Sequence, residues 1–262
     1  MIEAAYAAEG AEHGGGSAGG LPNPMHQFEI KRLIPFELFG FDASFTNSAL
    51  FMLIAATLIT LFTVYAMHSR ALVPSRLQSV AEISYEFIAN MVRDNTGTDG
   101  MKYFPFVFTL FMFVLTLNML GMVPYSFTVT SHIIVTFALA AFIFLGVTLL
   151  GFWKHGAKFL KFFVPEGVPI VMLPLLVVIE VISYLTRPLS LSVRLFANMM
   201  AGHTMLKVFG GFVVALGFLG GWAPLAFVVA LTGLEIGIAF LQAYVFTILT
   251  CIYLNDAIHL HH

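Results

Sequence analysis

The chain has 262 residues, of which 59% are hydrophobic and only 10% are charged, and its formal net charge is −2. Soluble domains carry about 25% charged residues, so this composition, with a mean hydropathy of +0.92, excludes an ordinary soluble protein and predicts one that lies in a bilayer. The near-zero net charge suggests no nucleic-acid partner. The single cysteine, Cys251, cannot form an internal disulfide, and we interpret it as a small apolar residue of a membrane helix.

The first 25 residues are rich in glycine and alanine and carry three glutamates. They lack the basic start and apolar core of a cleavable signal peptide, so we interpret 1–25 as a mobile N-terminal tail. The remainder is expected to form a single membrane domain over 26–255, followed by a short C-terminal tail over 256–262.

Three stretches are apolar and long enough to cross a bilayer, which takes about 20 residues. They are residues 43–67, 103–124 and 132–153. Residues 74–98, between the first two, mix charged with apolar side chains, which predicts an amphipathic helix lying at the membrane interface. A plain cytosolic helix is the alternative for this segment.

Two longer helical stretches, 166–209 and 223–254, make up the C-terminal half, and a glycine-rich turn separates them. The predicted fold class is therefore all-α: a polytopic membrane protein with about five membrane helices and one interfacial amphipathic helix. The last two helices are expected to form a hairpin.

Short loops rich in Lys and Arg mark the cytoplasmic side of a membrane protein. Such residues follow the first and third spans: Arg70, Arg76, Arg93, Lys102, Lys154, Lys158 and Lys161. This distribution predicts that the N-terminus is outside and the C-terminus is cytoplasmic. Lys31 and Arg32 conflict with this orientation, but they are outweighed by the two concordant loops.

A narrow polar stripe follows the first of the two long helices. Its members are spaced by 3, 4, 3, 4 and 4 residues: Glu180, Ser183, Arg187, Ser190, Arg194 and Asn198. At about 100° per residue they fall within roughly an 80° arc. Serine and asparagine alone would fit hydrogen bonding between packed helices, but an arginine at membrane depth costs from about 3 to more than 10 kcal/mol. Arg194 is therefore predicted to be functional, whereas Arg187, just before Pro188, could equally be an interfacial anchor.

The last helix carries a second polar set, Glu235 and Gln242, which share a face because they are seven residues apart. In an antiparallel hairpin, pairing Arg194 with Gln242 centres the turn at residue 218, and pairing His203 with Glu235 centres it at residue 219. One register thus satisfies both pairs. It leaves Glu235 about 13 Å and Glu180 about 21 Å along the helix axis from Arg194. A buried guanidinium without an internal anion implies that the counter-charge comes from another chain or from a transported ion.

The ionisable groups are also separated along the axis. His203 and Glu235 lie toward the outside, Glu180 lies toward the cytoplasm, and Arg194 lies between them. Histidine titrates near neutral pH and burial raises a glutamate toward it, so this layout predicts two polar access routes divided by a fixed positive charge.

The other histidines are poor candidates for a site. His132 and His155 flank the third span and are expected at its interfaces, and the C-terminal histidines could bind metal only adventitiously: His259, His261 and His262. We therefore predict no metal site and no cofactor.

Four segments resemble subunit a of the F-type ATP synthase, and the likeness covers about 25–255. They are SLSVRLFANMMAGH at 190–203, LQAYVFTILT at 241–250, NMLGMVPY at 118–125 and MHQFEIKR at 25–32. The last of these is similar to alphaproteobacterial members. The resemblance implies a proton-translocating stator subunit of the bacterial inner membrane, not an enzyme on its own. Its partners would be a ring of c subunits, each with an essential carboxylate, and the b subunits of the peripheral stalk.

The resemblance also implies roles for single residues. Arg194 would match the essential arginine that attracts the deprotonated ring carboxylate and blocks a direct leak. His203 and Glu235 would match the outer half-channel, and some bacterial relatives carry these two residue types in the opposite order. Glu180 and Ser183 would match the cytoplasmic half-channel.

Three further residues are implied by the same likeness. Asn198 and Gln242 would match polar residues near the arginine, and Asn118 would line the outer route. The two long C-terminal helices of that family lie strongly tilted in the membrane. Whether the ion is H⁺ or Na⁺ would depend mainly on the ring.

A self-contained secondary ion transporter is the alternative function. Such transporters often show inverted repeats and broken helices, and the two halves of this chain show no convincing repeat. A haem-binding subunit would require histidines paired on facing membrane helices, and only His203 is central. The chain has no G-x-x-x-x-G-K-[ST] loop, which excludes a soluble ATP-binding role.

Overall fold

The computed structural model describes residues 30–259 apart from 31, 35–36, 39–40, 43, 69–73, 124–125 and 165–171. The predicted N-terminal tail and the last three residues lie outside this range, as do Lys31 and Arg70. The orientation in the membrane and the interfacial position of 74–98 stay predictions.

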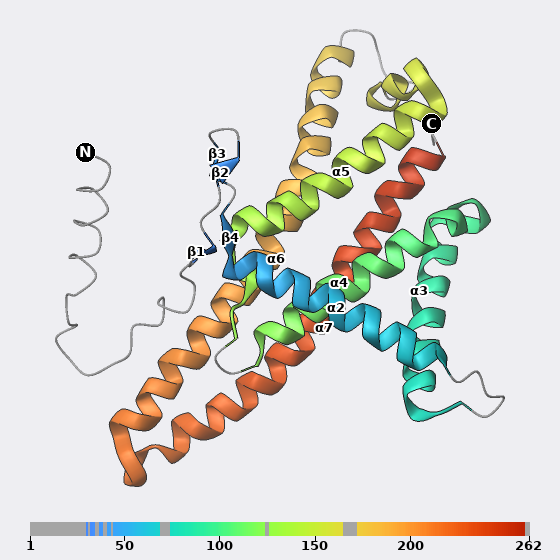
Figure 1. The fold of residues 1–262 in the computed structure, drawn as a ribbon. Helices are drawn as coiled ribbons and strands as arrows, with labels where there is room; N and C mark the ends of the chain where they lie inside the picture. The colour runs from blue at the N-terminus through green and yellow to red at the C-terminus, as the bar shows by residue number, and fades with distance from the viewer. Residues whose placement is uncertain are drawn as a thin grey trace.

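The described chain is almost entirely helical (Figure 1). Near its start, two small antiparallel sheets form, β1 (Arg32–Ile34) with β4 (Phe45–Thr46) and β2 (Glu37–Leu38) with β3 (Phe41–Asp42). The helices follow in order: α2 (Asn47–His68), α3 (Arg76–Gly100), α4 (Phe104–Gly121), α5 (Ile133–His155), α6 (Leu173–Gly220) and α7 (Trp222–Ile258). Short 3₁₀ turns lie between them: η2 (Met101–Tyr103), η3 (Val129–Ser131) and η4 (Gly156–Phe163). The predicted all-α class is confirmed.

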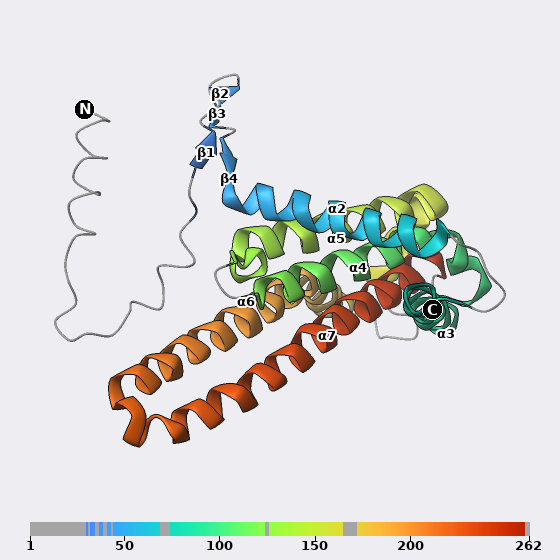
Figure 2. The same cartoon turned by 60° about the horizontal axis from the view of Figure 1, so that its bottom comes forward.

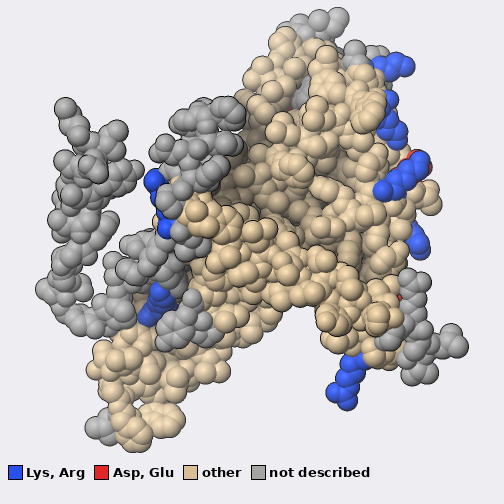
Figure 3. Space-filling model, viewed as in Figure 1, with Lys and Arg blue, Asp and Glu red and all other residues tan. Residues whose placement is uncertain are grey.

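Five helical stretches of the described chain are long and apolar enough to cross a membrane, as predicted. One of them joins α3 to α4 through η2. Figure 3 shows a largely uncharged face, with Lys and Arg gathered toward its margins. This is the surface expected of a protein surrounded by lipid, where charged side chains keep to the ends of the helices.

The bounds of the two last helices differ from those predicted. Helix α6 begins at Leu173 and continues to Gly220 rather than ending at residue 209, because the glycines at 210 and 211 lie within the helix. Helix α7 continues to Ile258 and so takes up part of the predicted C-terminal tail. Glycine lowers helix propensity by only about 1 kcal/mol, which helix packing readily overrides.

Helix α3 begins at a capped end and packs one face on the bundle. The Ser75 hydroxyl accepts a hydrogen bond from the backbone N–H of Gln78 at 3.3 Å, which satisfies one of the donors left open at a helix start. Its buried apolar residues Ile88 and Val92 join the main core, and its other faces carry exposed polar and apolar side chains. This two-sided character fits an amphipathic helix.

Helices α6 and α7 form an antiparallel hairpin that projects beyond the rest of the bundle (Figures 1 and 2). The turn forms at Gly217, whose φ of +59° suits glycine, and the N–H of Gly221 donates to its carbonyl at 2.9 Å. Both predicted turn centres, residues 218 and 219, fall within this turn. Pro188 lies inside α6, where it removes one backbone hydrogen bond and allows the long helix to bend.

One face of α6 is fixed by the core. Leu191, Leu195 and Met199 are buried among side chains of α4 and α7. Ser190, Arg194 and Asn198 each precede one of these residues, so they are turned by about 100° around the helix, and all three are exposed. The core packing therefore points this part of the polar stripe outward from the chain. Cys251 is buried in the same core as a small apolar residue.

Candidate functional site

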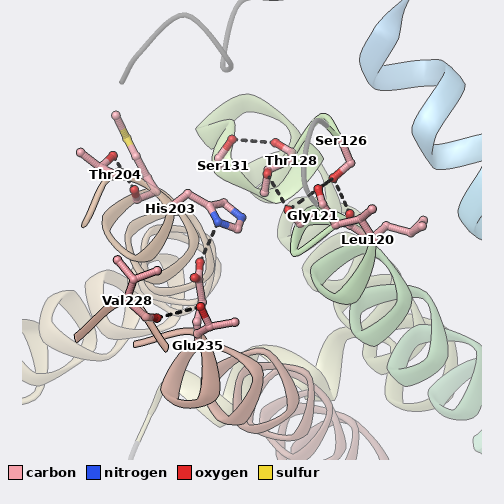
Figure 4. A network of polar contacts seen from close by, with 12 residues as sticks. Leu120, Gly121, Ser126, Thr128, Ser131, His203, Thr204, Val228 and Glu235 are labelled. Atoms are coloured by element: carbon pink, nitrogen blue, oxygen red, sulfur yellow. Dashed lines mark hydrogen bonds and ion pairs between the residues drawn. The ribbon is translucent and has the colours of Figure 1, made fainter. Parts of the chain in front are cut away.

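His203 and Glu235 form a buried pair between the two long helices (Figure 4). The Nδ1 atom of His203 lies 2.7 Å from Oε1 of Glu235. The residues are only 6% and 3% exposed. The side-by-side placement predicted from the hairpin register is therefore confirmed.

Two glycines make room for this pair. A Cβ atom at Gly202 would lie 2.7 Å from Oε1 and 3.0 Å from Cδ of Glu235, so only a hydrogen at this position lets the carboxyl group approach α6. A Cβ at Gly121 of α4 would lie 2.8 Å from Thr128 Cγ2 and 3.4 Å from His203 Nε2. Figure 4 shows the imidazole pointing toward this end of α4.

Several buried polar atoms near the pair have no hydrogen-bond partner among the described residues: His203 Nε2, Glu235 Oε2, Asn118 Oδ1 and Gln242 Nε2. The Nδ2 group of Asn118 donates to the carbonyl of Ala239 at 3.2 Å, which joins α4 to the face of α7 between Glu235 and Gln242. Buried polar groups normally have a hydrogen-bond partner in the protein or in ordered water. A row of such buried polar atoms leads from the pair toward Gln242.

Gln242 contacts α6 through Asn198. The Nδ2 group of Asn198 donates to Oε1 of Gln242 at 3.0 Å. The predicted contact between Arg194 and Gln242 is not formed, because the two helices meet one turn further along α6 than the register suggested. The contact between Asn198 and Gln242 nonetheless lies within about one helical turn of Arg194 on α6.

Arg194 points outward on α6. It forms no hydrogen bond and no ion pair within the described part of the chain, which agrees with the predicted absence of an internal anion. Arg194 is exposed on the surface of this chain. The reason is the neighbouring Leu195, which takes the core-facing position.

The stripe begins near the start of α6. Glu180 is half-buried and Ser183 is exposed, and both lie on the same side of the helix as Arg194. The carboxylate of Glu180 has no hydrogen-bond or ion-pair partner among the residues that the structure describes. A second set of polar side chains thus lies on the far side of Arg194 from the buried pair.

Arg187 forms a contact that the sequence did not suggest. Its Nη1 atom donates to Oδ2 of Asp256 at 2.9 Å. Its guanidinium also lies over the rings of Tyr184 and Tyr253, at 5.3 and 5.2 Å from their centroids. Arg187 therefore links α6 to α7, and this end of α7 had been predicted as a tail.

The hairpin register predicts a partner for Arg187 on the last helix, but not at the position of Asp256. A turn centred at residue 218 or 219 places the partner of Arg187 near residue 250, whereas the observed partner lies six residues later. The stretch from Arg187 to His203 has 16 residue steps on α6, and the stretch from Glu235 to Asp256 has 21 on α7. The helices thus leave the ideal register toward the start of α6 and the end of α7, where α6 contains Pro188.

The remaining histidines contact other parts of the chain. His132 stacks on Phe127 with ring centroids 5.0 Å apart, and burial lowers the pKa of its imidazole. His155 Nε2 lies 3.1 Å from the carbonyl oxygen of Ile258. His259 Nδ1 lies 3.0 Å from Oδ1 of Asn255. No group of three His, Cys, Asp or Glu residues in the described part of the chain could hold a metal ion.

In this site an exposed arginine, without a partner among the described residues, lies between a buried histidine–glutamate pair and a separate glutamate. The sequence also matches a known family. Residues 49–255 match the family model described as "ATP synthase A chain". The chain belongs to this family. The resemblance found in the sequence is thereby confirmed.

Curated relatives agree with this assignment. The chain is 63% identical over 241 residues to "ATP synthase subunit a" of Pelagibacter ubique (strain HTCC1062), an alignment that covers 92% of this chain and 99% of the relative. It is 63% identical over 246 residues to the protein of that name from Chelativorans sp. (strain BNC1), with 92% and 99% covered. For Parvibaculum lavamentivorans (strain DS-1) the identity is 60% over 262 residues, with 97% and 100% covered.

Family membership and the five apolar helices make the chain a multi-pass protein of the bacterial inner membrane. The family is a membrane-sector subunit of the ATP synthase complex, associated with ion transport, and not an enzyme on its own. This argues against the alternative of a self-contained secondary transporter.

We expect Gly202→Ala to disturb the buried pair directly. The added methyl group would lie against the Glu235 carboxyl group, and overpacking of this kind costs about 1–3 kcal/mol, so ATP-driven ion transport should fall by about fivefold or more. Inverted membrane vesicles provide the measurement. Gly210→Ala is the matched control on the same helix, since no atom lies within 4 Å of its Cβ position. Equal transport in the two variants would contradict the positioning role of Gly202.

Proposed function

We propose that the chain is the proton-translocating stator subunit of the ATP synthase membrane sector. In this proposal it forms two half-channels against a rotating ring of c subunits, with Arg194 between them. The observation that carries the proposal is an exposed guanidinium on a membrane helix with no anion of its own among the described residues. Such a charge is too costly to leave facing lipid, so a partner must supply the anion.

The outer half-channel would begin at the buried pair. A proton arriving from outside binds to His203 or Glu235, whose facing atoms are 2.7 Å apart and suit proton exchange. It then passes beside Asn118 toward the amide pair of Asn198 and Gln242, where the polar route ends near the exposed stripe. A ring carboxylate at this level accepts the proton and becomes neutral.

The inner half-channel would begin on the other side of Arg194. Glu180 and Ser183 line the stripe at this end. The Glu180 carboxylate has no partner among the described residues, so it is available to accept a proton. A protonated ring site that has turned through the lipid reaches this end and releases its proton there. The site regains a negative charge and can then approach the arginine.

Arg194 would enforce the coupling between rotation and transport. Its guanidinium attracts the deprotonated ring carboxylate and repels a free proton, so no proton can pass directly from one route to the other. One elementary charge crossing 100 mV releases about 2.3 kcal/mol, which a direct leak would lose. Arginine suits this position because it stays protonated in proteins.

The surface around Arg194 suits a helical partner within the membrane. The stripe is bordered by exposed apolar residues of the same helix, including Leu189 and Val193. A ring helix with one carboxylate among apolar side chains would be complementary in both charge and hydrophobicity. The b subunits of the peripheral stalk would hold the chain against the turning ring, with its N-terminus outside and its C-terminus cytoplasmic.

We expect Arg194→Ala to abolish ATP-driven proton pumping and ATP synthesis. Removing a single preorganised charge typically lowers a rate by about 10²–10³. Arg194→Lys should rescue poorly, because an ammonium group is more strongly hydrated and loses its proton more readily when buried. Both activities are measured in membranes with equal amounts of assembled complex. Coupled synthesis at the normal rate in the Arg194→Ala membranes would overturn the proposed function.

Cysteines at Ser190 and Asn198 should cross-link to a cysteine in a ring helix, because both positions are exposed beside Arg194. The background for this test is Cys251→Ala, which removes the native thiol. A cysteine at Leu58, exposed on α2 away from the stripe, is the control and should give no ring product. Products within this chain alone would argue against an external partner.

His203 and Glu235 should behave as one coupled relay. Since their facing atoms are 2.7 Å apart, a change at one residue alters the surroundings of the other, so the two effects should not be additive. Each single exchange, His203→Glu or Glu235→His, places two groups of one kind together and should lower pumping by about a hundredfold. The double exchange restores an acid beside an imidazole and should retain more flux than either single variant.

The measurement for this pair is ATP-driven acidification of inverted vesicles for both single variants and the double variant. A double variant whose loss equals the product of the two single losses would mean that the residues act independently.

A further inference from the structure

The polar stripe of α6 contains two guanidinium groups, and they differ in their surroundings. Arg187 and Arg194 are seven residues apart, which is two helical turns or about 10 Å. Arg194 is exposed and forms no ion pair within the described chain, whereas Arg187 is half-buried and bound to Asp256. If the proposed function is right, both arginines lie on the side of α6 that a ring carboxylate passes.

The contact of Arg187 is built by three helices. Its guanidinium donates to Asp256 of α7 at 2.9 Å and lies over the rings of Tyr184 and Tyr253. The hydroxyl of Tyr184 in turn lies 2.7 Å from the Thr148 hydroxyl of α5. The side chains of Arg187 and Asp256 are only 22% and 29% exposed. The guanidinium is thus fixed in place and paired with one carboxylate.

The two arginines are close enough to act on the same passing charge. They lie about 10 Å apart along α6, which is about one Debye length at 0.1 M salt. A change in the charge at Asp256 therefore also alters the field close to Arg194. No comparable carboxylate faces Arg194 among the described residues.

We propose that Asp256 masks the charge of Arg187, so that Arg194 is the only guanidinium of the stripe offered to a ring carboxylate. This inference rests on the proposed function. Without Asp256 the stripe would present two competing cations two turns apart. A deprotonated ring site could then bind at Arg187, beside the inner route, and its advance to Arg194 and the outer route would slow.

A purely mechanical role for the pair makes a different prediction. If the ion pair only holds α6 against α7, removing both partners is at least as harmful as removing one. If Asp256 masks a charge, removing Arg187 as well eliminates the cation that needed masking. The double variant therefore separates the two explanations.

The test compares Asp256→Asn, Arg187→Gln and the double variant in inverted vesicles, at equal amounts of assembled complex. We expect D256N to lower ATP-driven pumping by about tenfold, because the unmasked Arg187 would compete with Arg194 for the ring carboxylate. R187Q and the double variant should stay within about twofold of the unaltered protein. Asp99→Asn is the matched control. Asp99 of α3 is exposed and lies near the C-terminal end of α7, where its carboxylate is 3.8 Å from His259.

Two outcomes would overturn the proposal: normal pumping by D256N, or a double variant as impaired as D256N. If D256N does not assemble, the exchanged pair Arg187→Asp with Asp256→Arg is used instead. It keeps a neutral pair and should pump normally, and weak pumping by its assembled complex would count against masking. Arg194→Ala is measured alongside. Normal pumping there would refute the proposed function itself, whereas normal D256N pumping beside an inactive Arg194→Ala would refute only the masking.

Discussion

The cost of placing a guanidinium at membrane depth governs this structure. The described chain deals with its two stripe arginines in opposite ways, pairing Arg187 with Asp256 and leaving Arg194 exposed without an anion. A lipid-facing arginine would cost several kcal/mol, which a membrane protein tolerates only when the charge is met by a partner or by water. In the proposed function the exposed stripe therefore depends on assembly for its stability, because the charge that drives the mechanism also requires a partner.

The fold positions this charge by ordinary packing. Leu191, Leu195 and Met199 occupy the core side of α6, so Arg194, one position before Leu195, must face outward. The same helix brings His203 against Glu235 because Gly202 has no side chain to occupy the space of the carboxyl group. The exposed cation and the histidine of the buried pair thus come from one helix, which fixes their separation along its axis more firmly than loops could.

Helix periodicity was enough to predict the stripe, the hairpin and the contact of His203 with Glu235, because these depend on 3.6 residues per turn and on a glycine turn. Three features could not be predicted this way. The hydropathy pattern predicted an end of α6 at residue 209, which is too early, because glycines inside a packed helix look like a helix break in the sequence. The partner of Gln242 proved to be Asn198, because a shift of one turn changes which side chains meet. Asp256 was missed because the helices depart from ideal register near Pro188, and sequence spacing carries no record of such bending.

The observed contacts of α6 with α7 leave Arg194 available to a partner. An Arg194 buried inside its own chain would need an internal anion, and a contact with Gln242 would supply only a neutral oxygen. Because Asn198 takes the amide oxygen of Gln242 instead, the guanidinium stays available at the surface. The polar side chains that lead from the buried pair then end about one turn from Arg194, whose charge has no partner within the described chain. In the proposed mechanism, proton delivery and charge attraction are therefore adjacent but separate, as a site needs if a passing carboxylate is first to bind as an anion and then to leave as a neutral acid.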